Sequence, residues 1–186
     1  MSGKKNKILL TGYRATGKTT IGKEVARRLD FAFLDTDREI EKKVGKTISQ
    51  IVSEHGWQYF REQEKLLLDQ LAAEKNLVIA AGGGAVMHHK SWQRLRQRGY
   101  TVWLTASTDT ICYRLARDKS NKDQRPSLTD KDFIEEVESV LNQRRGLYED
   151  GSDLQISSEQ DIGTVADEII RNYELGIKRA SALFNS

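Results

Sequence analysis

The chain has 186 residues, 38% of them hydrophobic, which fits one α/β domain spanning residues 1–186 with a full hydrophobic core. Its 30 Lys and Arg and 27 Asp and Glu give a net charge of +3, too small and too interspersed to predict a nucleic-acid partner. Cys112 is the only cysteine, and neither a signal-peptide pattern nor an apolar run of membrane-spanning length is present, so we expect a cytoplasmic protein without a membrane partner.

The first predicted element is a strand over Lys7–Thr11, followed by Gly12-Tyr13-Arg14-Ala15-Thr16-Gly17-Lys18-Thr19 and an amphipathic helix over Thr19–Leu29. This octapeptide fits G-x-x-x-x-G-K-[ST], whose backbone N–H groups cradle phosphates. Its two glycines let the backbone approach the anion, Lys18 adds a point charge, and Thr19 offers a hydroxyl to Mg²⁺. A glycine turn with a solvated lysine is the alternative, but the flanking strand and helix favour a nucleotide loop.

A pair of carboxylates follows the second apolar run. Phe31–Leu34 ends in Asp35-Thr36-Asp37, and a polar helix is predicted over Arg38–Lys43. Because open α/β sheets bind ligands at the carboxyl ends of their strands, Asp35 and Asp37 are candidates for the site. Both are also suited to capping the helix, and Asp37 is able to do both.

A triple glycine marks the end of the third predicted strand. Before it, Thr47-Ile48-Ser49-Gln50 predicts a capping box for a helix that Gly56 ends, and Trp57–Glu74 has the spacing of a long amphipathic helix. The strand Leu77–Ala81 then leads into Gly82-Gly83-Gly84. This turn lies at the sheet edge that carries the phosphate loop, so we interpret it as a close approach to a ligand in preference to a flexible turn.

The second half of the chain continues the alternation of strands and helices. The predicted elements are a helix over Trp92–Arg98, a strand over Tyr100–Leu104, helices over Thr108–Ala116 and Phe133–Tyr148, a strand over Leu154–Ile156 and a helix over Ile162–Ile170. Residues 175–186 either extend that helix or stay unstructured. Five strands alternating with helices predict a parallel sheet covered on both faces.

The segment between Arg117 and Asp132 is polar and contains the only proline of the chain. It is either a solvated loop or a lid over the site. His88 and His89 have no metal-ligand spacing and are interpreted as surface residues, and the three tryptophans as core or pocket wall.

A phosphate loop alone is compatible with a kinase, a nucleotide-driven switch or a motor. The Asn-Lys-x-Asp motif of a GTPase switch is absent. A small kinase needs a carboxylate near the acceptor hydroxyl, arginines for an anionic acceptor, and a lid that excludes water. The two carboxylates, Phe60-Arg61, the triple glycine and Arg125 in the polar segment meet these needs.

Six motifs stand in the order and approximate spacing of the shikimate kinase family, which the chain resembles over nearly its whole length. They are Gly12 to Thr19, Asp35-x-Asp37, Phe60-Arg61-x-x-Glu64, Gly82-Gly83-Gly84, Arg125-Pro126 and Arg144-x-x-Leu147-Tyr148. The resemblance implies an α/β, three-layer P-loop kinase fold with a five-stranded parallel sheet of order 2-3-1-4-5. It also implies a substrate-binding segment near residues 37–65, a lid near 117–130, and a monomer.

The activity implied by the resemblance is ATP-dependent phosphorylation of the 3-hydroxyl of shikimate, in the pathway to chorismate and the aromatic amino acids. By position, Asp37 would hold the acceptor hydroxyls and act as the base, and Lys18 and Arg125 would contact the transferring phosphoryl group. Arg61 and Arg144 would clamp the substrate carboxylate, because paired guanidinium N–H groups match its geometry. Gly82, Gly83 and Gly84 would lie against the same substrate.

The nucleotide and the metal have their own implied residues. ATP would be bound by Gly12, Ala15, Thr16, Gly17, Lys18, Thr19, Thr20, Arg114 and Arg125. Arg114 would lie against the adenine, although Arg117 is close enough in sequence to compete. Mg²⁺ would be bound by Thr19 and, through water, by Asp35.

Two positions depart from the pattern of many family members. Alanine stands at Ala15 where glycine is common, and is tolerated if the backbone there is not left-handed. Ser127 replaces a leucine that usually follows Arg-Pro. Two other functions stay open: a related kinase with a gluconate-like acceptor, which would lack the arginine and triple-glycine set, and a non-catalytic nucleotide-binding module, which would lose Asp37 or Lys18.

Overall fold

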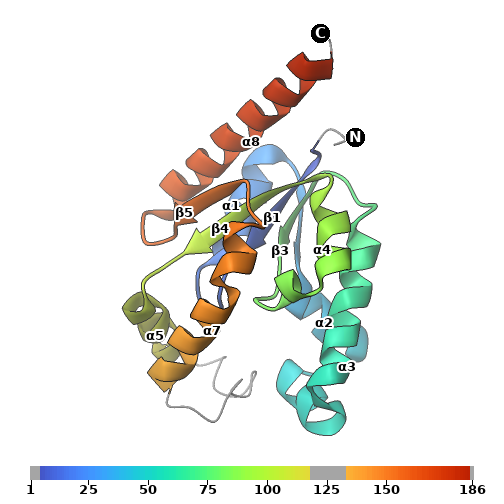
Figure 1. Ribbon diagram of the computed structural model, residues 1–186, viewed down its shortest axis with the longest axis vertical. Coiled ribbons are helices and arrows are strands. Elements are labelled where there is room, and N and C mark those ends of the chain that lie inside the picture. Colours follow the sequence, from blue (N-terminus) through green and yellow to red (C-terminus); the bar gives the residue numbers. More distant parts are fainter. Residues whose placement is uncertain (1–4, 118–132, 185–186) are drawn as a thin grey trace.

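Strand β1 (Lys7–Thr11) is the centre of a parallel sheet in the computed structural model, which describes residues 5–117 and 133–184. The strand order is β2-β3-β1-β4-β5, so the predicted order and fold class are confirmed (Figure 1). The other strands are β2 (Ala32–Asp35), β3 (Leu77–Ala80), β4 (Gly99–Thr105) and β5 (Leu154–Ser157). Arg125, Ser127 and most of the predicted lid lie outside the described residues.

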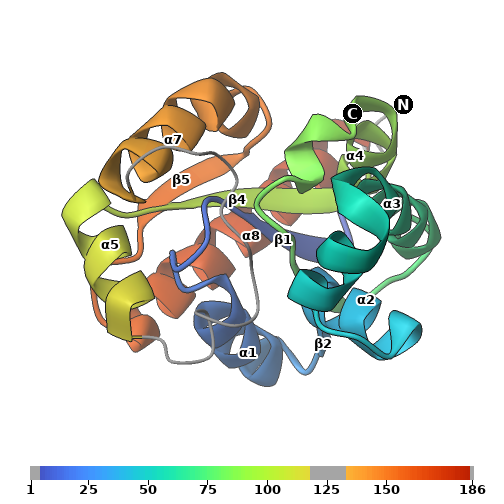
Figure 2. The ribbon, with the colours of Figure 1, turned by 90° about the horizontal axis from the view of Figure 1, so that it is seen from below.

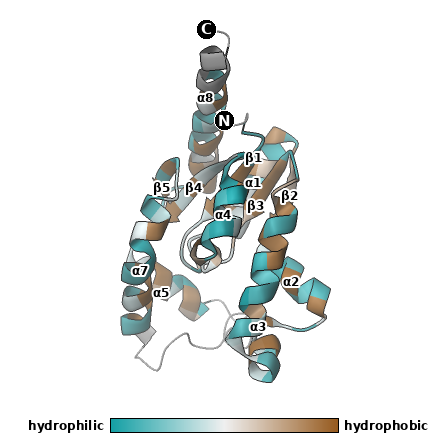
Figure 3. Ribbon diagram, turned by 45° about the vertical axis from the view of Figure 1, so that its right-hand side comes forward, coloured by the Kyte–Doolittle hydropathy of each residue, from teal (hydrophilic) through white to brown (hydrophobic). Residues whose placement is uncertain are grey.

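Helices cover both faces of this sheet, as Figure 2 shows. They are α1 (Lys18–Leu29), α2 (Thr36–Val44), α3 (Ile48–Leu71), α4 (His89–Arg96), α5 (Thr108–Arg117), α7 (Phe133–Glu149) and α8 (Ile162–Phe184), with a short 3₁₀ turn η1 (Ala85–Met87). In Figure 3, hydrophobic and hydrophilic residues alternate along α3, as expected for a helix with one face toward the core. Within the described residues, no helix combines the length and apolar character that crossing a membrane requires.

The alternation of side chains along β1 divides the core into two layers. Ile8 and Leu10 are fully buried and belong to the cluster formed with α1 and α8, whereas Leu9 belongs to the cluster formed with α3 and α4. Successive residues of a strand point to opposite faces, so a continuous apolar run fits a central strand buried on both sides. The phosphate loop leaves this central strand at its carboxyl end.

Two predicted helix boundaries have clear local causes. At the start of α3, the Gln50 N–H donates to Thr47 Oγ1 at 3.3 Å and the Thr47 N–H donates to Gln50 Oε1 at 2.9 Å, which confirms the capping box. Gly56 has φ 78° and ψ 166°, so it interrupts the helix where a break was predicted. α8 is longer than the predicted helix, because Tyr173 is buried and Ile177 packs against the core beyond Ile170.

Candidate active site

The phosphate loop is shaped by its backbone. Gly12 has φ 132° and Gly17 has φ 83°, conformations that residues with side chains rarely adopt. A Cβ atom at Gly12 would also overlap the carbonyl oxygen of Leu104 on the adjacent strand. Lys18 Nζ donates to the carbonyl oxygens of Gly12 and Tyr13 at 2.9 and 2.6 Å, so its ammonium group lies over the phosphate loop.

Ala15 is the strained residue of this loop. Its φ of 61° is left-handed, so the condition under which alanine would be tolerated without cost is not met. A residue with a Cβ atom is disfavoured in this region because Cβ approaches the following carbonyl oxygen. The loop therefore keeps its shape here against a local conformational cost.

The two carboxylates after β2 have different tasks. Asp35 Oδ2 accepts from the Thr19 hydroxyl at 2.6 Å, and Asp35 Oδ1 accepts from the N–H groups of Asp37 and Arg38 at 3.1 and 3.4 Å. Asp35 alone is thus the cap of α2, and the prediction that Asp37 also caps the helix is wrong. The Thr19 hydroxyl and the Asp35 carboxylate bring together the hard oxygen ligands that Mg²⁺ prefers, so these residues fit that ion.

A groove runs from the phosphate loop toward α5 and the start of α8. It is lined by Ala15, Gly17, Lys18, Thr19, Thr20 and Arg114 among others, whereas Gly12 and Thr16 are buried within the loop. The Arg114 guanidinium donates to the Ala15 carbonyl at 3.2 Å and to the Ser158 carbonyl at 2.9 Å. Arg117 is exposed and donates to the Tyr113 hydroxyl. Of the two candidates for the adenine side, Arg114 is the one that lines the groove.

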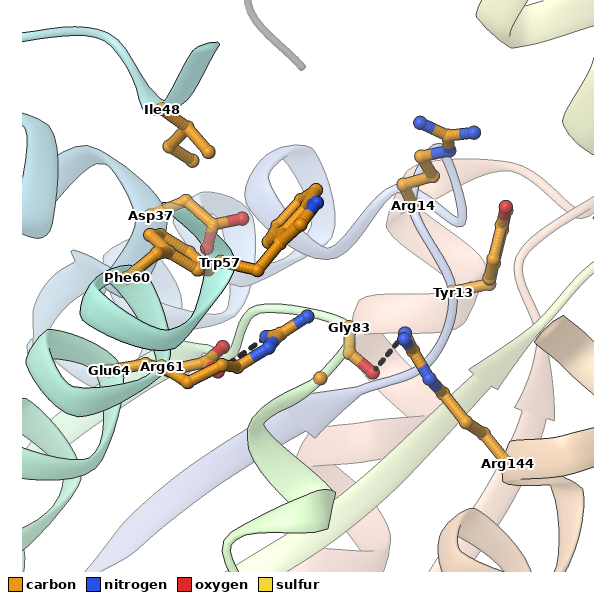
Figure 4. A pocket seen from close by; sticks show the side chains of 11 residues that line it. Tyr13, Arg14, Asp37, Ile48, Trp57, Phe60, Arg61, Glu64, Gly83 and Arg144 are labelled. Carbon is orange, nitrogen blue, oxygen red and sulfur yellow. Dashed lines mark hydrogen bonds and ion pairs between the residues drawn. The ribbon is translucent and has the colours of Figure 1, made fainter. Parts of the chain in front are cut away.

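A second pocket opens on the other side of Asp37. Its lining comes from the phosphate loop, α2, α3, the glycine turn and α7: Tyr13, Arg14, Asp37, Ile48, Trp57, Phe60, Arg61, Glu64, Gly83, Gly84 and Arg144. Figure 4 shows Arg61 and Arg144 pointing toward Gly83 from opposite sides, with Asp37 above. Asp37 and Arg14 line both this pocket and the groove, so the two cavities meet at these residues.

Both arginines of this pocket are held by hydrogen bonds. Arg144 Nη1 donates to the Gly83 carbonyl at 3.0 Å, and the Tyr148 hydroxyl donates to the same oxygen at 2.6 Å. Burial raises the pKa of Tyr148 to about 12, so its hydroxyl keeps the proton that this bond requires. Arg61 Nη1 donates to Glu64 Oε2 at 2.6 Å. The guanidinium groups are therefore oriented by the protein itself.

Glu64 is the buried anion beside this pocket, with 1% of its side chain exposed. Burial opposes its ionisation, but hydrogen bonds and charge from His88 and Arg61 outweigh burial and hold the pKa of Glu64 below its usual range. His88 Nε2 lies 2.9 Å from Glu64 Oε2 and only 15% of the His88 side chain is exposed. The interpretation of His88 as a surface residue is therefore wrong, whereas His89 is exposed as predicted.

Two glycines of the turn permit these side chains to approach. A Cβ atom at Gly84 would overlap the Arg61 guanidinium, and one at Gly82 would lie 2.6 Å from Asp37 Oδ1 and 2.7 Å from Glu64 Oε1. The Gly82 N–H also donates to Thr36 Oγ1 at 2.8 Å, which ties the turn to the start of α2. The turn is thus a place where the side chains of Arg61, Asp37 and Glu64 approach the backbone closely, and its approach to a ligand stays a prediction.

Several residues of the site were not singled out from the sequence. Glu64 and Tyr148 were each part of a quoted motif but had no assigned role. Glu64 had an available signal, because its spacing of three residues from Arg61 places both on one side of a helix. The contact of His88 with Glu64 joins segments 24 residues apart, and no local pattern announces it.

The match to known proteins covers most of the chain. The shikimate kinase family model matches residues 14–174. Shikimate kinase of Syntrophus aciditrophicus is 39% identical in an alignment of 176 residues that covers 90% of each chain. A shikimate kinase from Pelotomaculum thermopropionicum is 42% identical over 142 residues, which are 76% of this chain and 80% of the relative.

Solved structures agree with these relatives. Shikimate kinase from Acinetobacter baumannii, solved in complex with shikimate, superposes with a TM-score of 0.82 at 34% identity, covering 90% of this chain and 92% of that one. A gluconokinase from Sinorhizobium meliloti, with a TM-score of 0.57 and 16% identity, shares the fold alone. On the family model, the relatives and the structures together, the chain belongs to the shikimate kinase family.

Proposed function

We propose that this protein transfers the γ-phosphoryl group of ATP to the 3-hydroxyl of shikimate, giving ADP and shikimate 3-phosphate in the pathway to chorismate. The observation that carries the proposal is the pocket in which Arg61 and Arg144 converge while Asp37 lies where pocket and groove meet. A carboxylate-bearing acceptor bound by both arginines would have its hydroxyls near Asp37. The membership in the shikimate kinase family supports this choice of acceptor.

Arg61 and Arg144 bind the acceptor carboxylate in this proposal. Their guanidinium groups come from α3 and α7, so they approach one anion from two sides (Figure 4). Arginine suits the task because its planar fork donates two parallel hydrogen bonds to a carboxylate. Gly82, Gly83 and Gly84 complete this side, since glycine leaves room for the acceptor ring beside the arginines.

Asp37 binds the acceptor hydroxyls and takes the proton of the 3-hydroxyl as that oxygen attacks the γ-phosphorus. A carboxylate within hydrogen-bond reach of a hydroxyl is the usual base in such transfers. Asp37 lines the pocket together with Arg61 and Arg144, whereas Asp35 contacts Thr19 and the start of α2. We therefore assign the role of base to Asp37.

Lys18 and the backbone N–H groups of the phosphate loop bind the β- and γ-phosphates, with Gly12, Ala15, Thr16, Gly17, Thr19 and Thr20 forming the loop and the start of α1. The helix N-terminus adds a favourable dipole. Arg114 lies against the adenine side of the groove in this proposal, supported by its bonds to Ala15 and Ser158. Arg125, from the predicted lid, contacts the transferring group according to its place in the family motif.

Mg²⁺ is part of the proposal: the Thr19 hydroxyl would hold it, and Asp35 would act on it through water. When bound, it would neutralise charge on the phosphates. We propose that the protein is located in the cytoplasm, since its single cysteine is in keeping with a reducing compartment. We also propose that it is a monomer. Light scattering after size exclusion would measure the mass against the 21.2 kDa of the chain.

The decisive experiment is ADP release in the presence of ATP and Mg²⁺, with shikimate, with gluconate, and with no acceptor. We expect release that depends on shikimate, with product phosphate on the 3-hydroxyl in the NMR spectrum. Release that depends on gluconate would move the protein to another acceptor class. ATP binding without acceptor-dependent release for either compound would favour a non-catalytic nucleotide-binding module.

A further inference from the structure

The carboxylate of Glu64 receives two donors on the same oxygen. Arg61 Nη1 donates to Oε2 at 2.6 Å, and His88 Nε2 lies 2.9 Å from that oxygen. The other oxygen, Oε1, is buried and has no hydrogen-bond partner among the described residues. An ionised carboxylate is only an acceptor, so Nε2 must carry the proton in this contact. Arg61 and His88 therefore donate to the same oxygen, Oε2 of Glu64.

The backbone that carries His88 is fixed on both sides. The His88 N–H donates to the Ala85 carbonyl at 3.2 Å at the end of η1, and the His88 carbonyl accepts from Trp92 N–H at 2.8 Å at the start of α4. The imidazole therefore approaches Glu64 from a rigid turn that begins with the triple glycine. The same turn supplies Gly84, against which the Arg61 guanidinium packs.

We propose that His88 is a positioning residue for the acceptor: it fixes the Glu64 carboxylate so that Glu64 aims Arg61 at the substrate carboxylate. The inference rests on the proposed function, because it concerns the acceptor that Arg61 binds. His88 lines neither the pocket nor the groove. Its effect must therefore pass through Glu64.

The first test removes the donor. In His88→Leu we expect the KM for shikimate to rise about tenfold, while kcat and the KM for ATP change less than about twofold. His89→Leu is the matched control, because it makes the same chemical change at the exposed neighbouring residue, and it should leave all three constants unaltered. An unchanged KM for shikimate in His88→Leu overturns the proposal, as does an equal loss in all three constants with a lowered melting temperature.

The second test restores the hydrogen bond. Glutamine at this position keeps an N–H donor, so His88→Gln should restore the KM for shikimate to near the wild-type value. A KM for shikimate in His88→Gln as high as that in His88→Leu would overturn the proposal.

Failure of this inference differs from failure of the proposed function. If the wild type releases no ADP with shikimate, the proposed function is wrong, and neither kcat nor the KM for shikimate is defined. If the wild type is active and His88→Leu has a normal KM for shikimate, only the role of His88 is wrong. His88→Gln covers the case in which His88→Leu does not fold.

Discussion

The nucleotide side and the acceptor side of this molecule are built in different ways. On the nucleotide side, positive φ angles at Gly12, Ala15 and Gly17 shape the loop, and Lys18 is bonded to carbonyl oxygens of that same loop. On the acceptor side, side chains hold one another, as Arg61 and Glu64 of α3 and His88 of a distant turn do, or hold the glycine turn, as Arg144 of α7 does.

This difference explains where specificity resides. A loop built from backbone conformation recognises phosphate, which many substrates share, and needs only one continuous motif. In the proposed function, the pocket lined by side chains of α2, α3 and α7 recognises one acceptor, because both the carboxylate and the hydroxyls of that acceptor need partners. Substitutions on the acceptor side should therefore alter acceptor kinetics, whereas substitutions in the loop should act through backbone conformation.

The largest effect is expected at Asp37, where the two sides meet. Asp37→Asn keeps the shape of the side chain but removes the base, so kcat should fall by about a thousandfold or more. Affinity for an ATP analogue, measured by calorimetry, should change little because the loop is intact. Turnover near the wild-type rate would show that another group accepts the proton.

A large effect on the acceptor side is expected from a single methyl group at the glycine turn. In Gly84→Ala the new Cβ would overlap the Arg61 guanidinium, which is the mobile end of a long side chain and is able to move aside. The fold should tolerate this, but Arg61 would be misplaced, so the KM for shikimate should rise about tenfold with less effect on the KM for ATP.

Gly146→Ala on α7 is the matched control for this change. Apart from its chain neighbours and the backbone of its own helix turn, no described atom lies within 4 Å of a Cβ placed there, so the KM for shikimate should stay at the wild-type value. Equal kinetics of Gly84→Ala and the wild type would mean that the position of Arg61 does not set acceptor affinity.

Glu64, beside the acceptor pocket, is expected to make the free energy of unfolding depend on pH. Because its pKa is held below the usual range, the ionised carboxylate stabilises the fold at pH values above about 4.3, and this contribution is lost as the pH falls through the lowered pKa. Glu64→Gln should therefore lower the free energy of unfolding by about 1–3 kcal/mol at pH 7, with a smaller difference in acid. Urea unfolding at several pH values measures this.

Exposed Glu62 on the same helix provides the comparison. Glu62→Gln should change the free energy of unfolding by no more than about 0.5 kcal/mol at any of these pH values. A loss in Glu64→Gln that is the same at pH 7 and in acid would indicate a packing effect instead of a charge effect.

The same contrast governs what could be predicted from the sequence. The strand order that the family resemblance implied is confirmed. The phosphate loop has its predicted place between β1 and α1, because a local motif and the flanking apolar run indicate that place. On the acceptor side, Arg61 and Arg144 were identified from a family pattern and do line one pocket. The contact of His88 with Glu64 was missed because it joins α3 to a distant turn. Asp35 alone caps α2. The composition of the segment does not decide which of two nearby carboxylates caps the helix.

The smallest expected effect lies inside the phosphate loop, at Ala15. With φ at 61°, alanine has a left-handed cost of about 1–2 kcal/mol, and glycine would remove it. Glycine also gains more freedom in the unfolded chain, which offsets about 0.4–1 kcal/mol. Ala15→Gly should therefore stabilise the protein by about 0.5 kcal/mol and raise the melting temperature by about 1–2 °C, with kinetics for shikimate unchanged. A lower melting temperature would mean that the loop holds Ala15 by contacts worth more than its strain, and that backbone conformation alone does not shape the nucleotide side.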